Sequence, residues 1–597
     1  MIDLQSIKNP DFLKNLSLKE LENLAELIRQ FIIDSVSKTG GHLSSSLGTV
    51  ELIIALYYVF NAPFDKLIFD VGHQAYTHKI LTGRANDFST LRKDDGLSGF
   101  LSMRESIYDV YEAGHSSTSI SAASGFIKAR EKGEKIGEVV SIIGDASIQN
   151  GLALEAINYL GDHEKQKSII ILNDNNMSIS KNVGRISRFF NKIRIKKSYN
   201  RFSKIIPMRI RHSLKTIVYG ENPFSSMGYR YFGPIDGHNI KLLIKYFEFA
   251  KNCNEPVFLH IKTIKGKGYS FAEEDKIGKW HGVGPFNKET GEFISNKKDE
   301  LVKWSEGISN LLLEEAKLNN KIHVITPAMI YGSDLIDFQK ELPSQITDCG
   351  IAEDHAVIMA NALSLAGQIP IVMLYSTFLQ RAYDAINHDV CRINQHVVFL
   401  IDRSGIIGED GSTHQGVFDL GLLNALPNIE ILMPKDLTDA KILLNYAINI
   451  AKGPVAIRYP RGYTNSEIRL NNKSLEKFEI VLPLKEKNII TYGEDVLEFK
   501  KYLVELNKNY GLINAQFIKP LDLNFLSKLK NTNLIVYENN MIQGGLASSL
   551  LIINSKYDFN INFEIIGIDD QYVKHGNIQN VKNKLGLNIE EIVKRLK

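Results

Sequence analysis

The stretch formed by residues 139–180 constrains the fold of this chain most strongly. Two short apolar runs, 139–143 and 168–172, are rich in β-branched residues, and apolar side chains recur at helical spacing between them. A strand, a helix and a second strand in so short a unit form a right-handed crossover, so the strands are parallel. Both following turns then open at the carboxyl ends of the strands, where open α/β sheets bind ligands. The stretch therefore predicts an α/β fold with a binding site at that edge.

Polar side chains crowd the two turns that follow these strands. Asp145 lies in the first turn, and residues 173–176 supply three Asn and one Asp in the second. Carboxylate and amide oxygens suit a hard divalent cation, and the N–H groups of a helix N-terminus suit phosphate. The turns are therefore a candidate site for a divalent cation that carries a diphosphate. An ordinary crossover unit with polar turns remains the alternative.

Three other turns of the same region place a histidine beside glycine or serine. They contain His42 with Ser45, His73 after a strand expected over 68–71, and His115 between Gly114 and Ser116. One histidine in a loop usually has an ordinary hydrogen-bonding role. Three in equivalent turns of one α/β domain favour proton transfer, because imidazole titrates near neutral pH. His42 and Ser45 are expected just ahead of an apolar helix.

Length and composition exclude several classes of protein. The chain has 597 residues, 44% hydrophobic and 23% charged, which is typical of a globular protein of several domains. A net charge of +3 gives no electrostatic case for nucleic acid, and no apolar run reaches the length of a membrane span. The N-terminus lacks the apolar core of a signal peptide, and three scattered cysteines give no disulfide framework. We expect a cytoplasmic protein with reduced thiols that binds neither nucleic acid nor membrane.

Strand and helix patterns repeat along the chain and predict three successive α/β domains with mainly parallel sheets. The expected limits are 1–291, 301–480 and 486–597, with a polar linker near 295–300. Strands of the second domain are expected at 322–326, 369–374, 397–401, 429–433 and 455–458. Those of the third domain are expected at 489–492, 512–517, 534–537 and 564–568.

A basic insertion interrupts the first domain at about 184–222. Eleven lysines and arginines, and no acidic residue, lie between 184 and 220. The favoured interpretation is a mobile, solvated flap. A basic cover that attracts phosphorylated substrate, or a patch for membrane or nucleic acid, are the alternatives.

Several segments resemble the 1-deoxy-D-xylulose-5-phosphate synthase family, in the transketolase-like branch of thiamin-diphosphate enzymes. They are DVGHQAYTHKILTGR (70–84), AGHSSTSISAASG (113–125), YSTFLQRAYDAINHD (375–389) and EDGSTHQG (409–416). Gly144-Asp145 with a later Asn is similar to the GDG…N fingerprint of the wider family. The resemblance covers nearly the whole chain. It implies a transketolase-like fold, a homodimer, thiamin diphosphate and Mg²⁺ as cofactors, and a transferase that condenses pyruvate with D-glyceraldehyde 3-phosphate.

The resemblance also assigns roles to individual residues. Mg²⁺ would be held by Asp145, the Asn175 side chain and the Met177 carbonyl. Besides these three, the cofactor would contact His73, Gly114, His115, Ser116, Ala146, His281, Glu353 and Phe378. Substrates would contact Ser45, Tyr375, Arg381, Arg403, His414 and Arg461. The catalytic groups would be Glu353, His42, His73, His414 and Asp410.

Two of these roles have a physical rationale in the sequence. Taken alone, Glu353 is a first-turn carboxylate that favours the dipole of the helix it opens. In the implied role it is buried with a raised pKa and shares a proton with N1′ of the aminopyrimidine ring. Arg403 and Arg461 follow strands, and guanidinium groups match the oxygens of a phosphate monoester.

Two departures from the family pattern bear on the cofactor site. Ala146 replaces the second glycine of the fingerprint, and we predict a negative φ there because a Cβ at positive φ costs about 1 kcal/mol or more. Gly284-Pro285 occupy the region where some members have a lysine. Two other functions stay open, which are a transketolase and a non-catalytic relative that binds thiamin diphosphate.

Overall fold

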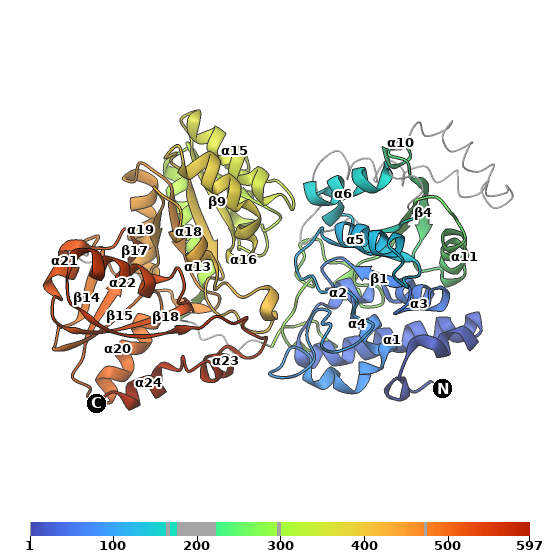
Figure 1. Ribbon diagram of the computed structural model, residues 1–597, viewed down its shortest axis with the longest axis horizontal. Coiled ribbons are helices and arrows are strands. Elements are labelled where there is room, and N and C mark those ends of the chain that lie inside the picture. Colours follow the sequence, from blue (N-terminus) through green and yellow to red (C-terminus); the bar gives the residue numbers. More distant parts are fainter. Residues whose placement is uncertain (1, 163–166, 176–222, 295–299, 471–473) are drawn as a thin grey trace. The chain divides into compact units, whose positions relative to one another are not determined.

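The computed structural model describes residues 2–162, 167–175, 223–294, 300–470 and 474–597 (Figure 1). These residues form two compact units, Met1–Ser295 and Asn296–Lys597. Met177 and the basic segment 184–222 lie outside the described residues, so their predicted roles stay predictions.

Unit 1 contains a five-stranded sheet in the order β1-β2-β3-β5-β4, and all its neighbouring strands are parallel. The strands are β1 Lys66–Phe69, β2 Val139–Gly144, β3 Ile169–Asp174, β4 Arg230–Asp236 and β5 Val257–Lys262. Helix α6 (Gly151–Gly161) connects β2 to β3, which confirms the predicted crossover. The strand expected over 68–71 was wrong by two residues, because the chain turns at Val71 with φ of 63°.

Helices cover both faces of this sheet. Helices α1 (Leu18–Thr39), α3 (Val50–Val59) and α11 (Ile240–Lys251) share one hydrophobic cluster with Phe69, Ile142 and Ile171. Helices α5 (Ser119–Glu131) and α6 share another with Ile68, Ile143 and Ile170. Adjacent strand residues therefore face opposite layers. The shorter helices are α2 Leu43–Leu47, α4 Tyr76–Lys79, α10 Pro223–Ser226 and α12 Ser270–Glu273.

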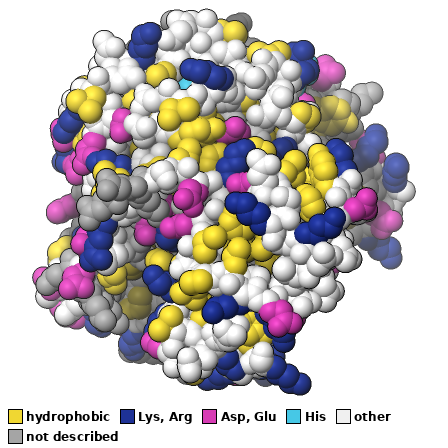
Figure 2. Space-filling view, turned by 90° about the vertical axis from the view of Figure 1, so that its left-hand side faces the viewer, with side chains coloured by type: hydrophobic (Ala, Val, Ile, Leu, Met, Phe, Trp, Pro, Cys, Tyr) yellow, Lys and Arg dark blue, Asp and Glu magenta, His cyan; other side chains and the backbone are white. Residues whose placement is uncertain are grey.

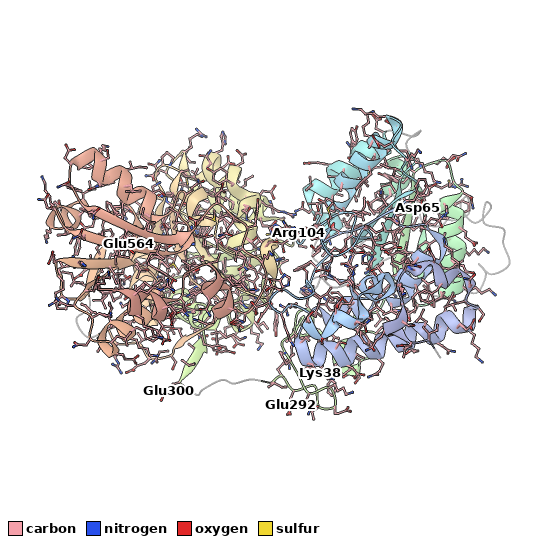
Figure 3. All side chains as sticks on the ribbon, turned by 60° about the horizontal axis from the view of Figure 1, so that its bottom comes forward. Lys38, Asp65, Arg104, Glu292, Glu300 and Glu564 are labelled. Carbon is pink, nitrogen blue, oxygen red and sulfur yellow. The ribbon has the colours of Figure 1, made fainter. Side chains whose placement is uncertain are left out.

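The two edges of the sheet in unit 1 differ in character. At the amino ends of the strands, Asp65 accepts hydrogen bonds from the backbone N–H groups of Glu138 (2.7 Å) and Asn61 (2.6 Å). Figure 3 labels this residue in unit 1. The buried carboxylate thus ties β1 to β2 at that edge. The turns that carry His73 and Asp145 follow the carboxyl ends of β1 and β2 instead.

Unit 2 contains a seven-stranded sheet in the order β17-β11-β12-β10-β9-β7-β8, parallel except for β17. Its strands are β7 Ile322–Thr326, β8 Ile346–Asp348, β9 Ile369–Tyr375, β10 Val398–Asp402, β11 Glu430–Leu432, β12 Val455–Arg458 and β17 Phe517–Lys519. The helices of this region are α13 Trp304–Leu318, α14 Ile336–Glu341, α15 Glu353–Leu365, α16 Ser376–Leu379, α17 Tyr383–Ala385, α18 Asp419–Asn424 and α19 Leu437–Asn449. The sequence predicted five of these strands within one or two residues and missed β8.

A second large sheet of unit 2 has the order β14-β16-β15-β18-β19, in which only β14 is antiparallel. Its strands are β14 Phe478–Leu482, β15 Lys487–Thr491, β16 Gly511–Ala515, β18 Asn533–Met541 and β19 Asn562–Ile568. The helices are α20 Asp495–Glu505, α21 Leu523–Lys528, α22 Leu546–Tyr557, α23 Ile578–Lys584 and α24 Ile589–Arg595. A small two-stranded sheet joins β6 Leu301–Lys303 to β13 Tyr463–Asn465.

The two large sheets of unit 2 are connected by strand β17 and by a shared hydrophobic cluster. The single strand expected over 512–517 is wrong, because the chain leaves β16 after Ala515 and β17 pairs antiparallel with β11 of the other sheet. Ile431, Ile513 and Val536 from both sheets share one hydrophobic cluster. Residues 296–597 therefore form one unit, and the domain limits 301–480 and 486–597 stay a prediction.

Surface features agree with the composition. The face drawn in Figure 2 mixes lysine and arginine with aspartate and glutamate among hydrophobic side chains. Within the described ranges, no helix has the length and apolar character needed to cross a membrane. All three cysteines are free, as expected.

Gly161 provides a test of packing in unit 1. A Cβ at Gly161 would lie 1.9 Å from the backbone oxygen of Met227, so Gly161→Ala should destabilise the protein by about 1–3 kcal/mol. A Cβ on Gly125, in the middle of α5, would meet no atom within 4 Å, and Gly125→Ala should stabilise by about 0.5–1 kcal/mol. Thermal unfolding followed by circular dichroism checks both shifts. Equal effects would mean that the close contact does not exist.

Candidate active site

The carboxyl edge of the sheet in unit 1 gathers the predicted metal-binding residues. Asp145 follows β2, and its N–H donates to the carbonyl of Asn173 at 3.2 Å, at the end of β3. Asp145 is buried and Asn175 is half-buried. Parallel pairing of β2 and β3 brings the two turns together, as the sequence predicts.

The polar residues expected in the turn after β3 divide into two groups, because Asn173 and Asp174 are the last two residues of the strand itself. The side chain of Asn173 accepts a hydrogen bond from Thr263 Oγ1 (2.6 Å), and the carboxylate of Asp174 lies 2.7 Å from Nε2 of His260. These two side chains therefore fasten β3 to the end of β5. The role of Asn175 as a ligand of the cation stays a prediction, and the third expected ligand, Met177, lies outside the described residues.

The two departures from the family pattern have simple structural outcomes. Ala146 has φ of −78° and ψ of −46°, so the predicted negative φ is confirmed and the alanine is unstrained. A Cβ on Gly284 would meet no atom within 4 Å, so crowding does not explain the absence of a lysine there.

Three histidines of unit 1 form a cluster. The ring centroids of His42, His73 and His281 lie 6.2, 6.1 and 5.2 Å apart, taken as the pairs 42–73, 42–281 and 73–281. Burial and the neighbouring charges of His42 and Lys265 hold the pKa of His73 well below its usual value, so its ring is neutral at neutral pH. Nδ1 of His73 is buried and has no hydrogen-bond partner among the described residues. A neutral ring with an unsatisfied nitrogen suits a bound polar ligand.

Asp70 joins the two loops that carry the other expected cofactor contacts. Its buried carboxylate accepts from Ser117 N–H at 2.6 and 2.8 Å and from Ser119 Oγ at 3.1 Å. Gly114 N–H donates to the carbonyl of Val71 at 2.9 Å. These contacts hold the 113–117 loop, with half-buried His115 and Ser116, against the loop that carries His73. The sequence predicted no role for Asp70, although an Asp directly after a strand at this edge is a usable signal.

Two details of this region differ from expectation or add to it. Ser45 lies inside the short helix α2 and not in the turn ahead of α3. Val71 has φ of 63°, which is strained for a β-branched residue and is typical of functional loops.

Glu353 is the central residue of the candidate site in unit 2. It opens α15 and is buried, and its Oε2 has no hydrogen-bond partner among the described residues. Burial raises the pKa of this carboxyl, although the charge of Arg381 acts in the opposite direction. A buried carboxyl with an unsatisfied oxygen fits the aminopyrimidine ring of the thiamin diphosphate that the resemblance implies.

An arginine pair lies near the ends of β10 and β12. The guanidinium of Arg403 stacks 3.9 Å from the ring centre of Tyr375, and Arg461 donates to the carbonyl of Ile407 at 3.0 Å. Both positive charges lower the pKa of Asp402. Burial has the larger effect and raises this pKa to about 7. The Tyr375 hydroxyl donates to the Gly332 carbonyl at 3.0 Å. The aromatic ring of Tyr375 therefore supports the guanidinium of Arg403, while the Tyr375 hydroxyl forms a hydrogen bond within the fold.

Phe378 and His414 complete this group. The ring of Phe378 stacks on Tyr375 with centroids 5.6 Å apart, and its edge meets His414 at 5.7 Å. Nδ1 of His414 lies 2.8 Å from Thr413 Oγ1, so Thr413, which the sequence analysis missed, orients this ring. Asp410 interacts electrostatically with Arg403, and its expected role beside His414 stays a prediction. The separation of Asp145 and Glu353, which lie in different units, also stays a prediction.

The raised pKa of Glu353 predicts a pH-dependent stability. Folding disfavours its ionised form, so the protein loses stability as pH rises above the ordinary carboxyl range and regains it below that range. Glu353→Gln should therefore melt at a higher temperature than the wild type at pH 8, and the difference should vanish toward pH 4. Asp354→Asn, at the exposed neighbouring position, is the matched control. A melting temperature for Glu353→Gln at or below that of the wild type at pH 8 would contradict this assignment.

Three family models match successive parts of the chain. Residues 4–263 match the family model described as 1-deoxy-D-xylulose-5-phosphate synthase. Residues 300–466 match the transketolase pyrimidine binding domain, and residues 477–592 match the transketolase C-terminal domain.

Similar proteins extend over the full chain. Proteins described as 1-deoxy-D-xylulose-5-phosphate synthase from Macrococcus caseolyticus (strain JCSC5402) and Geobacillus sp. (strain WCH70) are 44% and 43% identical. Each comparison covers 100% of this chain, with 99% and 98% of the relative. One from Clostridium tetani (strain Massachusetts / E88) is 45% identical over 98% of this chain and 97% of the relative. The chain belongs to the 1-deoxy-D-xylulose-5-phosphate synthase family.

Proposed function

We propose that this protein condenses pyruvate with D-glyceraldehyde 3-phosphate, with loss of CO₂, to give 1-deoxy-D-xylulose 5-phosphate. The observation that carries the proposal is identity of 43–44% to proteins of that name over the whole length of both chains. The reaction is the first step toward isoprenoid precursors by the non-mevalonate route and also feeds thiamin and pyridoxal biosynthesis. The protein acts in the cytoplasm as a homodimer, which sedimentation of the purified chain tests.

The described residues suit thiamin diphosphate and Mg²⁺. Asp145 and Asn175 supply a carboxylate and an amide at one edge of the sheet, and Met177 would add its carbonyl. Glu353 would face the aminopyrimidine with its unsatisfied oxygen. When bound, the cofactor accepts the electron pair that decarboxylation of pyruvate releases.

Side chains of the protein itself then hold and transfer protons. Glu353 holds a proton at N1′ of the aminopyrimidine, because burial favours its protonated form. His42, His73 and His281 are close enough to one another to act on the same substrate atoms, and His73 is neutral and available as a base or a donor.

The arginine pair supports the choice of a phosphorylated acceptor. Arg403 and Arg461 bind its phosphate, and the stack of Arg403 on Tyr375 fixes the direction of one guanidinium fork. The ring of His414 lies 5.7 Å from that of Phe378 and can bind a hydroxyl or carbonyl group of the same substrate.

An assay of CO₂ release separates this function from its alternatives. Purified protein with thiamin diphosphate and Mg²⁺ should release CO₂ from pyruvate when D-glyceraldehyde 3-phosphate is present. Turnover of ketose phosphates without pyruvate would assign a transketolase instead. Binding of thiamin diphosphate by calorimetry without either turnover would assign a non-catalytic relative.

Replacement of Glu353 tests the proton role directly. Glu353→Ala should slow exchange of the C2 proton of bound thiamin diphosphate about 10²–10⁴-fold, in line with the loss of a positioned proton-transfer group. Exchange is followed by NMR after quenching in deuterated water. Asp354→Ala serves as the control. Wild-type exchange in Glu353→Ala would remove this residue from the mechanism.

Replacement of Arg461 tests the phosphate role. Arg461→Ala should raise KM for D-glyceraldehyde 3-phosphate about 10–100-fold, because it removes a charge-assisted hydrogen bond, and should change KM for pyruvate little. Arg469→Ala is a matched control, since Arg469 is exposed and pairs with Glu467 at 2.5 Å. Parallel increases in both KM values would refute a phosphate contact.

A further inference from the structure

The loop between β10 and α18 folds back on itself beside the arginine pair. Gly405 and Gly416 form an antiparallel bridge, with distances of 2.6 and 2.8 Å between each N–H nitrogen and the carbonyl oxygen of the other residue. This bridge brings the side chain of Gln415 against the backbone of Ile407. Gln415 is only 2% exposed, and a buried amide is unfavourable unless its polar atoms are hydrogen-bonded.

The amide of Gln415 forms hydrogen bonds with both of its polar atoms. Its Oε1 accepts from the N–H of Ile407 at 2.7 Å and from that of Gly408 at 3.4 Å. Its Nε2 donates to the carbonyl of Lys574 at 3.1 Å and to that of Gly408 at 3.4 Å. The two shorter bonds connect Ile407 to a segment that lies far along the chain. Only a side chain with both an acceptor and a donor can make this connection.

Arg461 is attached to the other side of the same residue. Its guanidinium donates to the carbonyl of Ile407 at 3.0 Å and pairs with Glu409 at 3.1 Å. Ile407 therefore contacts Gln415 through its N–H and Arg461 through its carbonyl. The side chain of Arg461 is 34% exposed, so a ligand can reach the guanidinium. The direction of a guanidinium fork decides whether it meets phosphate oxygens, and the position of Ile407 sets that direction.

The C-terminal segment 572–577 packs against the same loop. Gly576 N–H donates to the carbonyl of Gly408 at 3.3 Å. A Cβ on Gly408, where φ is +93°, would lie 2.9 Å from the carbonyl oxygen of Gly576. The rings of Tyr572 and Phe418 meet edge to face with centroids 5.6 Å apart. These contacts hold the segment in place beside the loop, so the amide of Gln415 attaches the loop to a fixed support.

We propose that Gln415 is a positioning residue for the phosphate of the acceptor substrate, because it holds Ile407, and through it the guanidinium of Arg461, against the C-terminal segment. The proposal rests on the proposed function, since it presupposes that Arg461 binds the phosphate of D-glyceraldehyde 3-phosphate. The competing role is a purely structural one, in which Gln415 only satisfies buried backbone groups. A positioning role affects the phosphorylated acceptor alone, whereas a structural role affects all substrates alike.

Kinetics of the full chain with thiamin diphosphate and Mg²⁺ distinguish the two roles. Gln415→Met keeps the length of the side chain and removes its hydrogen bonds. It should lower kcat/KM for D-glyceraldehyde 3-phosphate about 3–10-fold, the effect of about one hydrogen bond. Unphosphorylated D-glyceraldehyde as acceptor, and KM for pyruvate, should change little. Equal losses with both acceptors would overturn the proposal.

Gln345→Met is the matched control for this variant. The amide of Gln345 also donates to backbone carbonyls, at 3.0 to 3.2 Å, but it lies just before β8, at the amino edge of the same sheet. Gln345→Met should therefore keep the wild-type preference for the phosphorylated acceptor. The same loss of preference in Gln345→Met and Gln415→Met would overturn the proposal, because it would not require a contact with Ile407.

A double-mutant cycle tests whether Gln415 acts through Arg461. In the Arg461→Ala background the guanidinium is absent, so Gln415→Met should lower kcat/KM for D-glyceraldehyde 3-phosphate by less than about twofold. Losses that multiply would mean that Gln415 acts elsewhere and would overturn the proposal.

Two further measurements cover misfolding and a failure of the proposed function. If Gln415→Met melts early, Gln415→Glu, which keeps an acceptor for Ile407 N–H, is judged by the same comparison of acceptors. If the wild type shows no turnover, the proposed function fails, and calorimetry with D-glycerol 3-phosphate, a phosphate monoester without an aldehyde, tests the phosphate contact alone. Gln415→Met should then bind this probe about 3–10-fold more weakly. Unchanged affinity, or no binding by the wild type, would overturn the proposal.

Discussion

Parallel pairing of adjacent strands is the constraint on which the candidate site of each unit depends. In unit 1 it brings the turns after β1, β2, β3 and β5 to one edge, so that His73, Asp145 and Asn175 become neighbours although they are far apart in sequence. In unit 2 it does the same for the ends of β9, β10 and β12, where the arginine pair and Tyr375 meet. At the opposite edge of the first sheet, Asp65 accepts hydrogen bonds that tie β1 to β2. The described site residues of unit 1 lie away from that edge.

Much of this arrangement could be predicted from sequence, because strongly β-branched runs gave β2, β7 and β12 nearly to the residue. Strand β8 was missed because three residues are too few to show a pattern, and the break between β16 and β17 depends on pairing with the distant β11. The same distinction between local sequence patterns and distant contacts applies to the residues of the candidate sites. The histidines and Glu353 lie in recognisable segments, whereas the contact of Asp70 with Ser117 forms only when two loops meet in space.

Each unit holds groups near its candidate site in states that the fold would otherwise avoid. Glu353 and Asp402 are buried carboxyls with raised pKa values, and each lies beside an arginine whose charge only partly offsets burial. Val71 and Arg403 have φ values of 63° and 61° directly after strands. Strain and unfavourable burial of this kind persist only when the surrounding structure fixes them, and here hydrogen-bonded loops and close-packed glycines provide that support.

Because β17 pairs with β11 of the neighbouring sheet, the last hundred or so residues are not structurally independent of that sheet. Without β17, the outer edge of β11 would expose unpaired N–H and C=O groups, and Ile431 would lose neighbours such as Ile513 from its hydrophobic cluster. A chain that ended before β14 would therefore have an unpaired, aggregation-prone sheet edge next to exposed core residues. Loss of the C-terminal segment would therefore require the sheet that carries the arginine pair to be rebuilt.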